Sequence, residues 1–170
     1  MDFRKVETGN MKLQAVREDM IGFICELKKA FDEFSGKHNI DFKFVSEFNS
    51  LDVWFDPDKM EKILYNLLSN AFKFTPDNGK VEVNVLKDKM ENGNECVKII
   101  VKDSGIGISS DRLTKIFNRF YQIENSDRLK RTIEREGTGI GLSLTRELIL
   151  LHHGSINVES EEGKRLYFYC

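Results

Sequence analysis

Apolar residues along this chain recur with two periods, one typical of helices and the other typical of strands. From about residue 19 they recur at three- and four-residue steps, which predicts a helix that ends before Gly36. A second helix is predicted over residues 57–74, because Asp56-Pro57 is a typical helix start and Thr75-Pro76 ends the pattern.

Two further helices are predicted over residues 110–117 and 139–153, the second ending before Gly154. Strands are predicted where apolar and polar residues alternate or where β-branched residues form short runs. These segments cover residues 11–16, 40–44, 53–55, 81–85, 97–101, 155–160 and 166–170. Their order predicts an α/β fold: a two-layer sandwich in which about three helices cover a mixed, mostly antiparallel sheet.

Length and composition fit one globular domain with a substantial core. The 170 residues are 40% hydrophobic and include 13 Phe, 4 Tyr and one Trp. The 26 basic and 28 acidic residues give a net charge of −2, so we expect neither a nucleic-acid partner nor a membrane contact. Any site for a phosphate group must therefore be built locally.

The cysteines and the apolar runs predict a cytoplasmic domain. Cys25, Cys96 and Cys170 are odd in number and widely spaced, which argues against a disulfide framework or a zinc knuckle and favours a reducing compartment. The longest aliphatic run, residues 148–151, is far too short to cross a membrane. The N-terminus also lacks the apolar core of a signal peptide.

The helix over residues 57–74 carries a polar stripe beside its apolar one. Asn66, Asn70 and Lys73 lie at i, i+4 and i+7 and therefore share one side of the helix. From this helix alone two interpretations are equally good. The stripe is either a solvated face, or a pair of amide oxygens that bind a hard cation next to an ammonium group that binds phosphate.

Two glycine-containing segments, residues 103–108 and 137–142, are candidate phosphate or nucleotide loops. Glycines at the start of a helix leave backbone N–H groups open to an anion, and the helix dipole adds a favourable potential. Neither segment fits the dinucleotide pattern G-x-G-x-x-G, since Ser110 and Leu142 stand where the third glycine is required. The sequence also lacks G-x-x-x-x-G-K-[ST], which excludes a P-loop.

Four motifs in order resemble the catalytic ATP-binding domain of two-component sensor histidine kinases. They match the N box at residues 66–76, the G1 box at 103–108, the F box at 116–121 and the G2 box at 137–142. The resemblance implies the Bergerat-type ATP-binding fold, which is shared with gyrase, other type II topoisomerases and mismatch-repair ATPases. It implies ATP and Mg²⁺ as cofactors.

The same resemblance implies a role for each matching residue. Asp103 would accept a hydrogen bond from the exocyclic amine of adenine, while Asn70 and Asn66 would hold Mg²⁺ and Lys73 would contact a phosphate. Other implied nucleotide contacts are Gly105, Gly107, Ile108, Phe120, Thr138, Gly139, Gly141 and Leu142.

The F box and the segment after it carry further expectations. Arg119 either stabilises the transferring phosphoryl group or is a solvated cation. Phe117 and Phe120 are expected to anchor, by packing, a long functional loop over residues 124–136.

Asn66 also bears on the reaction. Hydrolysing relatives carry a Glu at this position, whereas an amide cannot take a proton from water, so we expect transfer to a protein acceptor instead of efficient hydrolysis. A stand-alone ATPase and a non-catalytic nucleotide-binding scaffold are the alternatives. None of His38, His152 and His153 has the sequence setting of the family's phosphoacceptor.

The resemblance therefore implies a catalytic module separated from its acceptor. Residues 10–170 would form the ATP-binding domain, and residues 1–9 would be the tail of an upstream dimerisation helix. The implied partners are a dimerisation domain that bears the acceptor His, in a homodimeric membrane-bound parent, and the receiver domain of a response regulator. One departure from the family, Arg165 after Gly163-Lys164, puts the register of the last strand in question.

Overall fold

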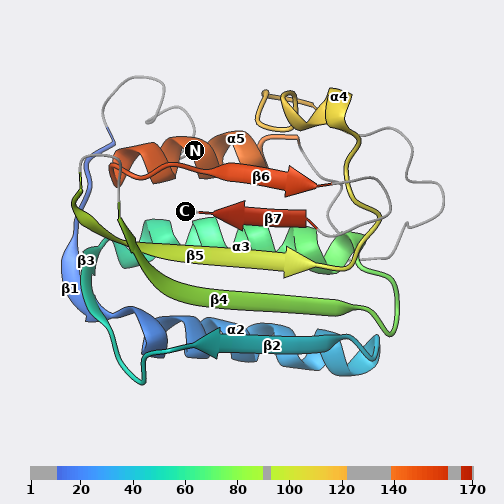
Figure 1. Ribbon diagram of the computed structural model, residues 1–170, viewed down its shortest axis with the longest axis horizontal. Coiled ribbons are helices and arrows are strands. Elements are labelled where there is room, and N and C mark those ends of the chain that lie inside the picture. Colours follow the sequence, from blue (N-terminus) through green and yellow to red (C-terminus); the bar gives the residue numbers. More distant parts are fainter. Residues whose placement is uncertain (1–10, 90–92, 122–138, 161–165, 170) are drawn as a thin grey trace.

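The computed structural model describes residues 11–89, 93–121, 139–160 and 166–169 of the chain (Figure 1). Its helices are α2 (Met20–Lys37), α3 (Pro57–Phe74), α4 (Ser110–Leu113) and α5 (Gly141–Leu151). Its strands are β1 (Val16–Asp19), β2 (Asp41–Ser46), β3 (Asp52–Phe55), β4 (Lys80–Lys89), β5 (Glu95–Asp103), β6 (Asn157–Ser160) and β7 (Leu166–Tyr169).

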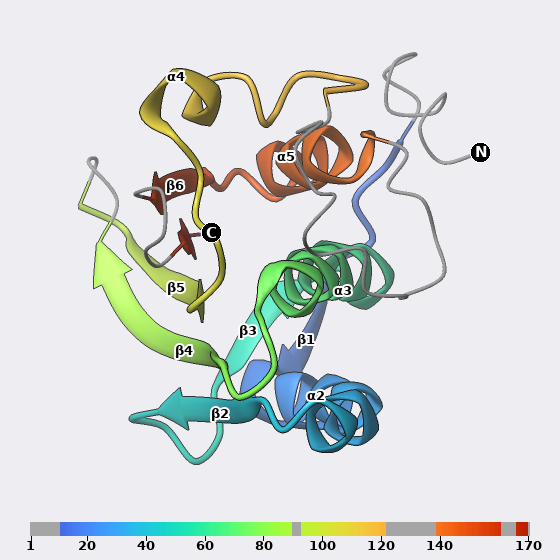
Figure 2. The same ribbon diagram turned by 90° about the vertical axis from the view of Figure 1, so that its right-hand side faces the viewer.

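Five strands form one sheet in the order β2-β4-β5-β7-β6, and α2, α3 and α5 lie together against one of its faces (Figure 2). The pair β2–β4 is parallel, and the other pairs in this sheet are antiparallel. The expected two-layer sandwich with a mixed, mostly antiparallel sheet is confirmed. β7 pairs with both β5 and β6, in a register that places Phe168 opposite Val101 and Val158.

β1 and β3 do not belong to that sheet. They pair with each other as a separate antiparallel ribbon, in which Val16 lies opposite Phe55. The sequence pattern predicted a strand over residues 11–16, but the strand begins only at Val16. A short run of alternating residues shows that one face is buried, and it does not identify the strand against which the run pairs.

α3 is the central helix of the layer, and its sequence explains both its limits and its burial. The Asp56 side chain caps its N-terminus by accepting from the Lys59 N–H, Pro57 occupies the first turn, and Thr75 is its C-cap. One face is fully packed, and each large apolar side chain on it contributes about 1.5–3 kcal/mol of burial free energy. The buried residues on this face are Met60, Ile63, Leu64, Leu67, Leu68, Ala71 and Phe72.

Aromatic rings join α2 and β2 to α3. Phe31 stacks on Phe72 at 5.3 Å between ring centroids, and Phe42 meets Phe72 edge-on at 5.0 Å. Phe34 approaches Phe72 edge-on from the next turn of α2. Such pairs add about 0.5–1.5 kcal/mol beyond the burial of their area, so this cluster fixes the first half of the chain against α3.

The C-terminal ends of α2 and α5 differ from the sequence prediction. α2 continues through Gly36 to Lys37, because left-handed backbone is first adopted at Asn39, with φ 51°. At the end of α5, His153 takes the left-handed conformation (φ 61°), and the Gly154 N–H then donates to the Ile149 carbonyl. Helix termination at α5 therefore uses the residue before the expected glycine.

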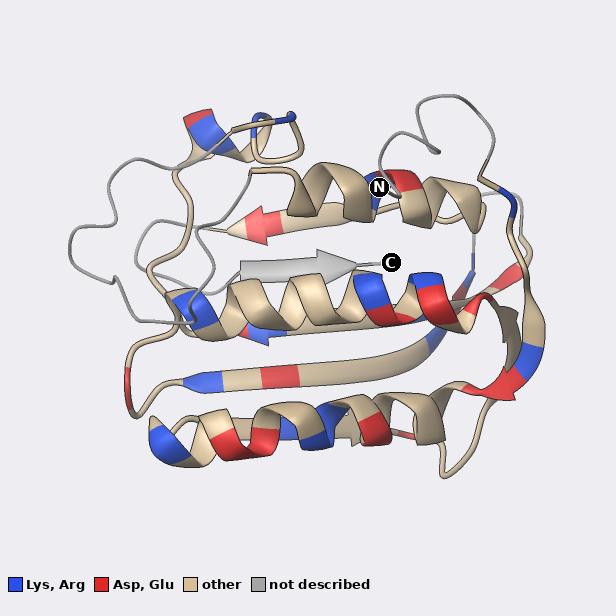
Figure 3. Ribbon diagram, turned by 180° about the vertical axis from the view of Figure 1, so that it is seen from behind, with Lys and Arg blue, Asp and Glu red and all other residues tan. Residues whose placement is uncertain are grey.

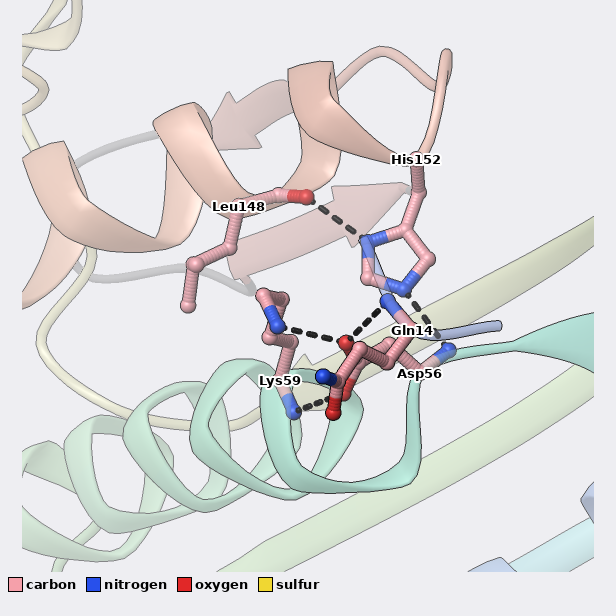
Figure 4. A network of polar contacts seen from close by, with 5 residues as sticks. All are labelled: Gln14, Asp56, Lys59, Leu148 and His152. Atoms are coloured by element: carbon pink, nitrogen blue, oxygen red, sulfur yellow. Dashed lines mark hydrogen bonds and ion pairs between the residues drawn. The ribbon is translucent and has the colours of Figure 1, made fainter. Parts of the chain in front are cut away.

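A polar network ties the start of α3 to the end of α5 (Figure 4). The His152 Nε2 atom accepts from the Asp56 N–H at 3.1 Å, and His152 Nδ1 lies 2.8 Å from the Leu148 carbonyl oxygen. Because an N–H only donates and a carbonyl only accepts, these partners select the neutral imidazole with its proton on Nδ1. The Asp56 carboxylate in turn accepts from the Gln14 N–H and from the Lys59 ammonium.

The outer surface carries interspersed charges. Figure 3 shows acidic and basic residues interspersed along α2 and near the two ends of α3, with few on α5. No helix in the described ranges has both the length and the apolar character needed to cross a membrane.

We expect Asp56→Ala to destabilise the domain by about 2–3 kcal/mol, because it removes the α3 cap and leaves the Gln14 N–H and the Lys59 ammonium without their acceptor. Denaturant unfolding measures this change. Asp58→Ala is the matched control, since Asp58 is exposed in the same helical turn and its loss should cost about 0.5 kcal/mol. Equal losses for the two variants would contradict the network.

Candidate functional site

Those predicted site residues that the structure describes gather at one end of the sandwich. The second half of α3, the end of β5 and the start of α5 meet there, and the segment that carries α4 continues from β5 (Figure 1). Asn66, Asn70 and Lys73 are half-buried on the side of α3 that the apolar stripe leaves open. The predicted division of α3 into an apolar face and an amide stripe is confirmed.

Asn66 lies between α3 and α5 and contacts α5 at both ends of its carboxamide. Its Nδ2 donates to Thr145 Oγ1 at 2.8 Å. Its Oδ1 rests against the backbone of Gly141, where a Cβ atom would overlap it. Thr145 was missed by the sequence reasoning, because a Thr within an apolar helix gives no signal until the helix against which it packs is known.

Asn70 and Lys73 lie one and two turns beyond Asn66. Within the described residues the Asn70 carboxamide makes no hydrogen bond. The Lys73 ammonium sits 5.4 Å from the centroid of the Phe74 ring. The same described residues contain no cluster of three or more His, Cys, Asp or Glu able to hold a metal ion. A cation here would be bound by amide oxygens and by the oxygens of a ligand, as Mg²⁺ commonly is.

Asp103 ends β5 as a buried carboxylate, with only 3% of its surface exposed. Burial raises the pKa of Asp103 to about 6, although the Gly105 N–H donates to its Oδ1 at 2.7 Å and acts in the opposite direction. A carboxylate so poorly solvated is stabilised by any further donor, such as an amine.

The turn after Asp103 is fitted closely to the end of α3. A Cβ atom on Gly105 would lie 2.6 Å from the Phe74 carbonyl oxygen and 2.6 Å from Asp103 Oδ1, so only glycine fits. Ser104 anchors the turn to the start of β4, because its N–H donates to the Lys80 carbonyl and its Oγ accepts from the Lys80 N–H. The buried carboxylate is therefore held in a fixed place relative to α3.

The chain then runs past β6 to the short helix α4. Gly107 has a positive φ of 68°, and the Ile108 N–H donates to Ser160 Oγ at 2.8 Å. α4 ends at Leu113 and not at residue 117 as predicted. Ile116 is nevertheless buried, and Phe117 packs partly against the core, as expected for an anchor.

Phe120 is different, and the prediction that it packs as a second anchor is wrong. Its side chain is 69% exposed, and its backbone has a positive φ of 61°. The Phe120 N–H donates to the Gly139 carbonyl at 2.9 Å, so the backbone of Phe120 joins the two sides of the site. Gly139 has φ 67° and leaves no room for a Cβ beside Phe120. Arg119 is exposed, and Thr138 and residues 124–136 lie outside the described residues.

The start of α5 has the features of an anion site. Its N-cap residue, Ile140, makes no capping hydrogen bond with its side chain, so the first N–H groups of α5, starting at Gly141, have no such partner. Leu142 packs partly against the core and fixes the first turn. Together with Asn66, Asn70 and Lys73, this helix start offers N–H donors, amide oxygens and an ammonium to one ligand.

Residues 55–170 match the family described as histidine kinase-, DNA gyrase B- and HSP90-like ATPase. The chain belongs to this family. The matched range runs from the last residue of β3 to the end of the chain and contains every site residue named above.

Histidine kinases are prominent among its relatives. The chain is 35% identical over 162 residues to a histidine kinase of Formosa agariphila, covering 95% of this chain and 11% of that protein. It is 32% identical to the sensor protein kinase WalK of Staphylococcus aureus, over 88% of this chain and 34% of WalK. The chain thus spans about a tenth to a third of the length of these curated relatives.

Solved structures of histidine kinases have the same fold as this chain. The catalytic domain of histidine kinase ThkA superposes with a TM-score of 0.73 at 27% identity, covering 92% of this chain and 95% of that domain. ThkA in complex with the response regulator protein TrrA gives a TM-score of 0.72 at 25% identity, over 98% of this chain and 45% of ThkA. Full-length ShkA in complex with AMPPNP shares the fold, with a TM-score of 0.80 at 23% identity, over 98% of this chain and 32% of ShkA.

The raised pKa of Asp103 makes a prediction about pH. The carboxylate form, which accepts from an amine, dominates only above pH 6, so adenine-nucleotide affinity should fall about tenfold between pH 7 and pH 5. Calorimetry with ADP measures this. Asp103→Asn should bind weakly without this pH dependence. Because it removes a buried charge, it should also stabilise the nucleotide-free domain at pH 7 by about 1–3 kcal/mol. Equal wild-type affinities at the two pH values would refute the implied role of Asp103 as the group that binds adenine.

Gly141→Ala tests the contact with Asn66. We expect a loss of about 1–3 kcal/mol in unfolding free energy, because the added methyl group overlaps the carboxamide. Gly36→Ala is the matched control: it also lies in a helix but has open space, so it should stabilise the domain by about 0.5–1 kcal/mol. In an Asn66→Ala background the Gly141→Ala penalty should disappear. A penalty that persists there would show that another neighbour causes it.

Proposed function

We propose that this chain is the ATP–Mg²⁺-binding catalytic module of a sensor histidine kinase, which delivers the γ-phosphoryl group of ATP to a His on a separate dimerisation domain. One observation carries the proposal. The amide stripe of α3, the buried carboxylate at the end of β5 and the uncapped start of α5 converge at one end of the sandwich. This convergence supports an adenine site, a metal site and a phosphate site that serve one nucleotide.

Asp103 is the adenine-binding group in this proposal. Its desolvated carboxylate favours a partner that presents an N–H donor, and the exocyclic amine of adenine is such a donor, whereas guanine presents a carbonyl there. Gly105 and Gly107 carry no side chain, so the base and ribose can approach the backbone at these two positions of the adjoining turn. Ile108 supplies a half-buried apolar contact next to this turn.

Asn70 and Asn66 are the proposed metal ligands, and Lys73 is the proposed phosphate ligand. The amide oxygens are hard donors, and the absence of a carboxylate cluster among the described residues suits an ion that shares its coordination with phosphates. When bound, Mg²⁺ supplies the positive charge that phosphoryl transfer requires at the phosphate oxygens. The protein groups orient the triphosphate and keep its terminal group accessible.

The start of α5 would bind the phosphates through its backbone. Gly139, Gly141 and Leu142 contribute N–H groups at a positive helix end, and Thr138 is proposed to extend this contact. We further propose that Phe120 lines the nucleotide and that Arg119 stabilises the charge on the transferring group. Both side chains are exposed, which supports these two assignments.

Transfer is favoured over hydrolysis because of Asn66. Its carboxamide cannot accept a proton from water, and its Nδ2 already donates to Thr145. The alternatives, a stand-alone ATPase and a nucleotide-binding scaffold without transfer, lack such support. The scaffold is disfavoured because the chain has the full set of donor groups around the site.

The partners follow from the proposed reaction. We place the phosphoacceptor His on the parent's own dimerisation domain, with residues 1–9 as the tail of its helix and 10–170 as the catalytic domain. The phosphoryl group would then pass to an Asp of a response regulator. The complex of the relative ThkA with TrrA supports a partner of this kind. Because ATP is a cytoplasmic nucleotide, we place the domain in the cytoplasm of a membrane-bound parent.

The test is a two-part incubation with γ-labelled ATP and Mg²⁺. Alone, the chain should bind nucleotide and release little phosphate. With the parent's dimerisation domain, it should label that domain through an acid-labile, alkali-stable phosphohistidine. Rapid phosphate release by the chain alone would instead establish the ATPase, and nucleotide binding without labelling of the dimerisation domain would establish the scaffold.

Asn70→Ala should lower the labelling rate by about 100-fold, as expected for loss of one preorganised group at the transferring phosphate. Glu61→Ala, an exposed substitution on the same helix, is the control and should label normally. The folded state of both variants is checked by thermal unfolding. Wild-type labelling by folded Asn70→Ala would remove Asn70 from the site.

A further inference from the structure

Thr145 is a buried polar residue on a helix whose other inward-facing groups are mostly apolar. Only 1% of its surface is exposed, and it lies one turn after Gly141, with Leu148 and Ile149 buried on the following turn. Its Oγ1 accepts from Asn66 Nδ2 at 2.8 Å. A buried hydroxyl that meets a residue of the proposed metal site calls for a functional explanation.

The carboxamide of Asn66 is clamped lengthwise along α5. Nδ2 is bound at Thr145, and Oδ1 rests at Gly141, which is four residues closer to the start of the helix. Since α3 and α5 run antiparallel, with Asp56 beside His152 at their far ends, Oδ1 is directed toward the end of the sandwich that holds Asn70. The hydrogen bond to Thr145 therefore determines which end of the amide faces the site.

We infer that Thr145 is a positioning residue for the metal site: its hydroxyl holds the Asn66 carboxamide with the oxygen toward the nucleotide-bound cation. This inference rests on the proposed function, because it gives Asn66 the role of a metal ligand. Thr145 itself touches neither nucleotide nor metal and acts through Asn66.

The physical reason is the near-symmetry of an amide. The oxygen and the NH₂ group of Asn have almost the same shape, so packing alone holds either orientation, and only hydrogen-bond partners distinguish them. Without an acceptor for Nδ2, the carboxamide loses the bond that specifies its orientation. A flipped amide would present N–H groups to a cation, which repel it.

A purely structural role makes a different prediction. If the Thr145–Asn66 bond served only to pack α3 against α5, its loss would lower stability and weaken all nucleotide binding alike. If Thr145 positions a metal ligand, its loss acts on the Mg²⁺ requirement and leaves Mg²⁺-free nucleotide binding, which depends on Asp103, unchanged. The two readouts are separable in the same protein.

The test uses the 170-residue chain and titrates Mg²⁺ at fixed concentrations of a fluorescent ATP analogue. Thr145→Val keeps the side-chain shape but removes the hydroxyl. We expect the Mg²⁺ concentration for half-maximal binding to rise about three- to tenfold, the range that one net hydrogen bond spans. Affinity without Mg²⁺ should stay the same. Thr145→Ser, which retains a hydroxyl, should restore most of the Mg²⁺ response.

Two further variants make the result specific. Ser143→Ala removes another buried hydroxyl of α5, which donates to the Ile140 carbonyl and not to Asn66, and it should leave the Mg²⁺ response unchanged. In an Asn66→Ala background, Thr145→Val should have no additional effect on the Mg²⁺ requirement, since the two residues act as one unit. Thermal unfolding without nucleotide verifies that each variant is folded.

Each contrary outcome is distinct. A normal Mg²⁺ requirement in Thr145→Val, or an equal effect of that substitution with and without Asn66, overturns the inference and leaves the proposed function intact. A parallel loss of Mg²⁺-free binding assigns the bond to packing. A wild-type chain whose nucleotide affinity does not respond to Mg²⁺ overturns the proposed metal site and this inference together.

Discussion

The packing of α3 on the sheet, with α2 on one side and α5 on the other, is the constraint on which the rest of the structure depends. One face of the helix is buried from Met60 to Phe72, so its rotation about its own axis is fixed by the core. That rotation places Asn66 and Asn70 on the open side. The amide stripe lies on the open side of α3 because the apolar stripe is buried in the core.

The two ends of the α3–α5 pair are built differently. At one end, Asp56, Lys59, His152 and the Gln14 backbone satisfy one another in a closed network that fixes the antiparallel pair. At the other end, the Asn70 amide and the first N–H groups of α5 lack such partners within the described residues. The end at which all these polar groups are hydrogen-bonded thus holds the helix pair in place, while the polar groups at the other end are available to a ligand. Such a division between stability and function is common.

Asp103 shows the cost of this arrangement. Burial raises its pKa to about 6, so near neutral pH the nucleotide-free domain carries a poorly solvated charge that opposes folding. Gly105 contributes the N–H that offsets part of this penalty, in a position where no other residue fits. A bound amine would offset more of it, so the same carboxylate that weakens the free domain favours the ligand-bound one.

The sequence by itself determined the two-layer fold, the limits of α3, the division of that helix into two stripes and the order of the motifs. Caps and periodic burial depend on residues that are close together in the sequence, so the sequence pattern predicts them directly. Only the tertiary structure decided the pairing of β1 with β3, the exposure of Phe120, the left-handed turn at His153 and the hydrogen bond from Asn66 to Thr145. A periodic pattern records that a side chain is buried but not which distant residue it meets. That partner is fixed only when α3 and α5 pack together.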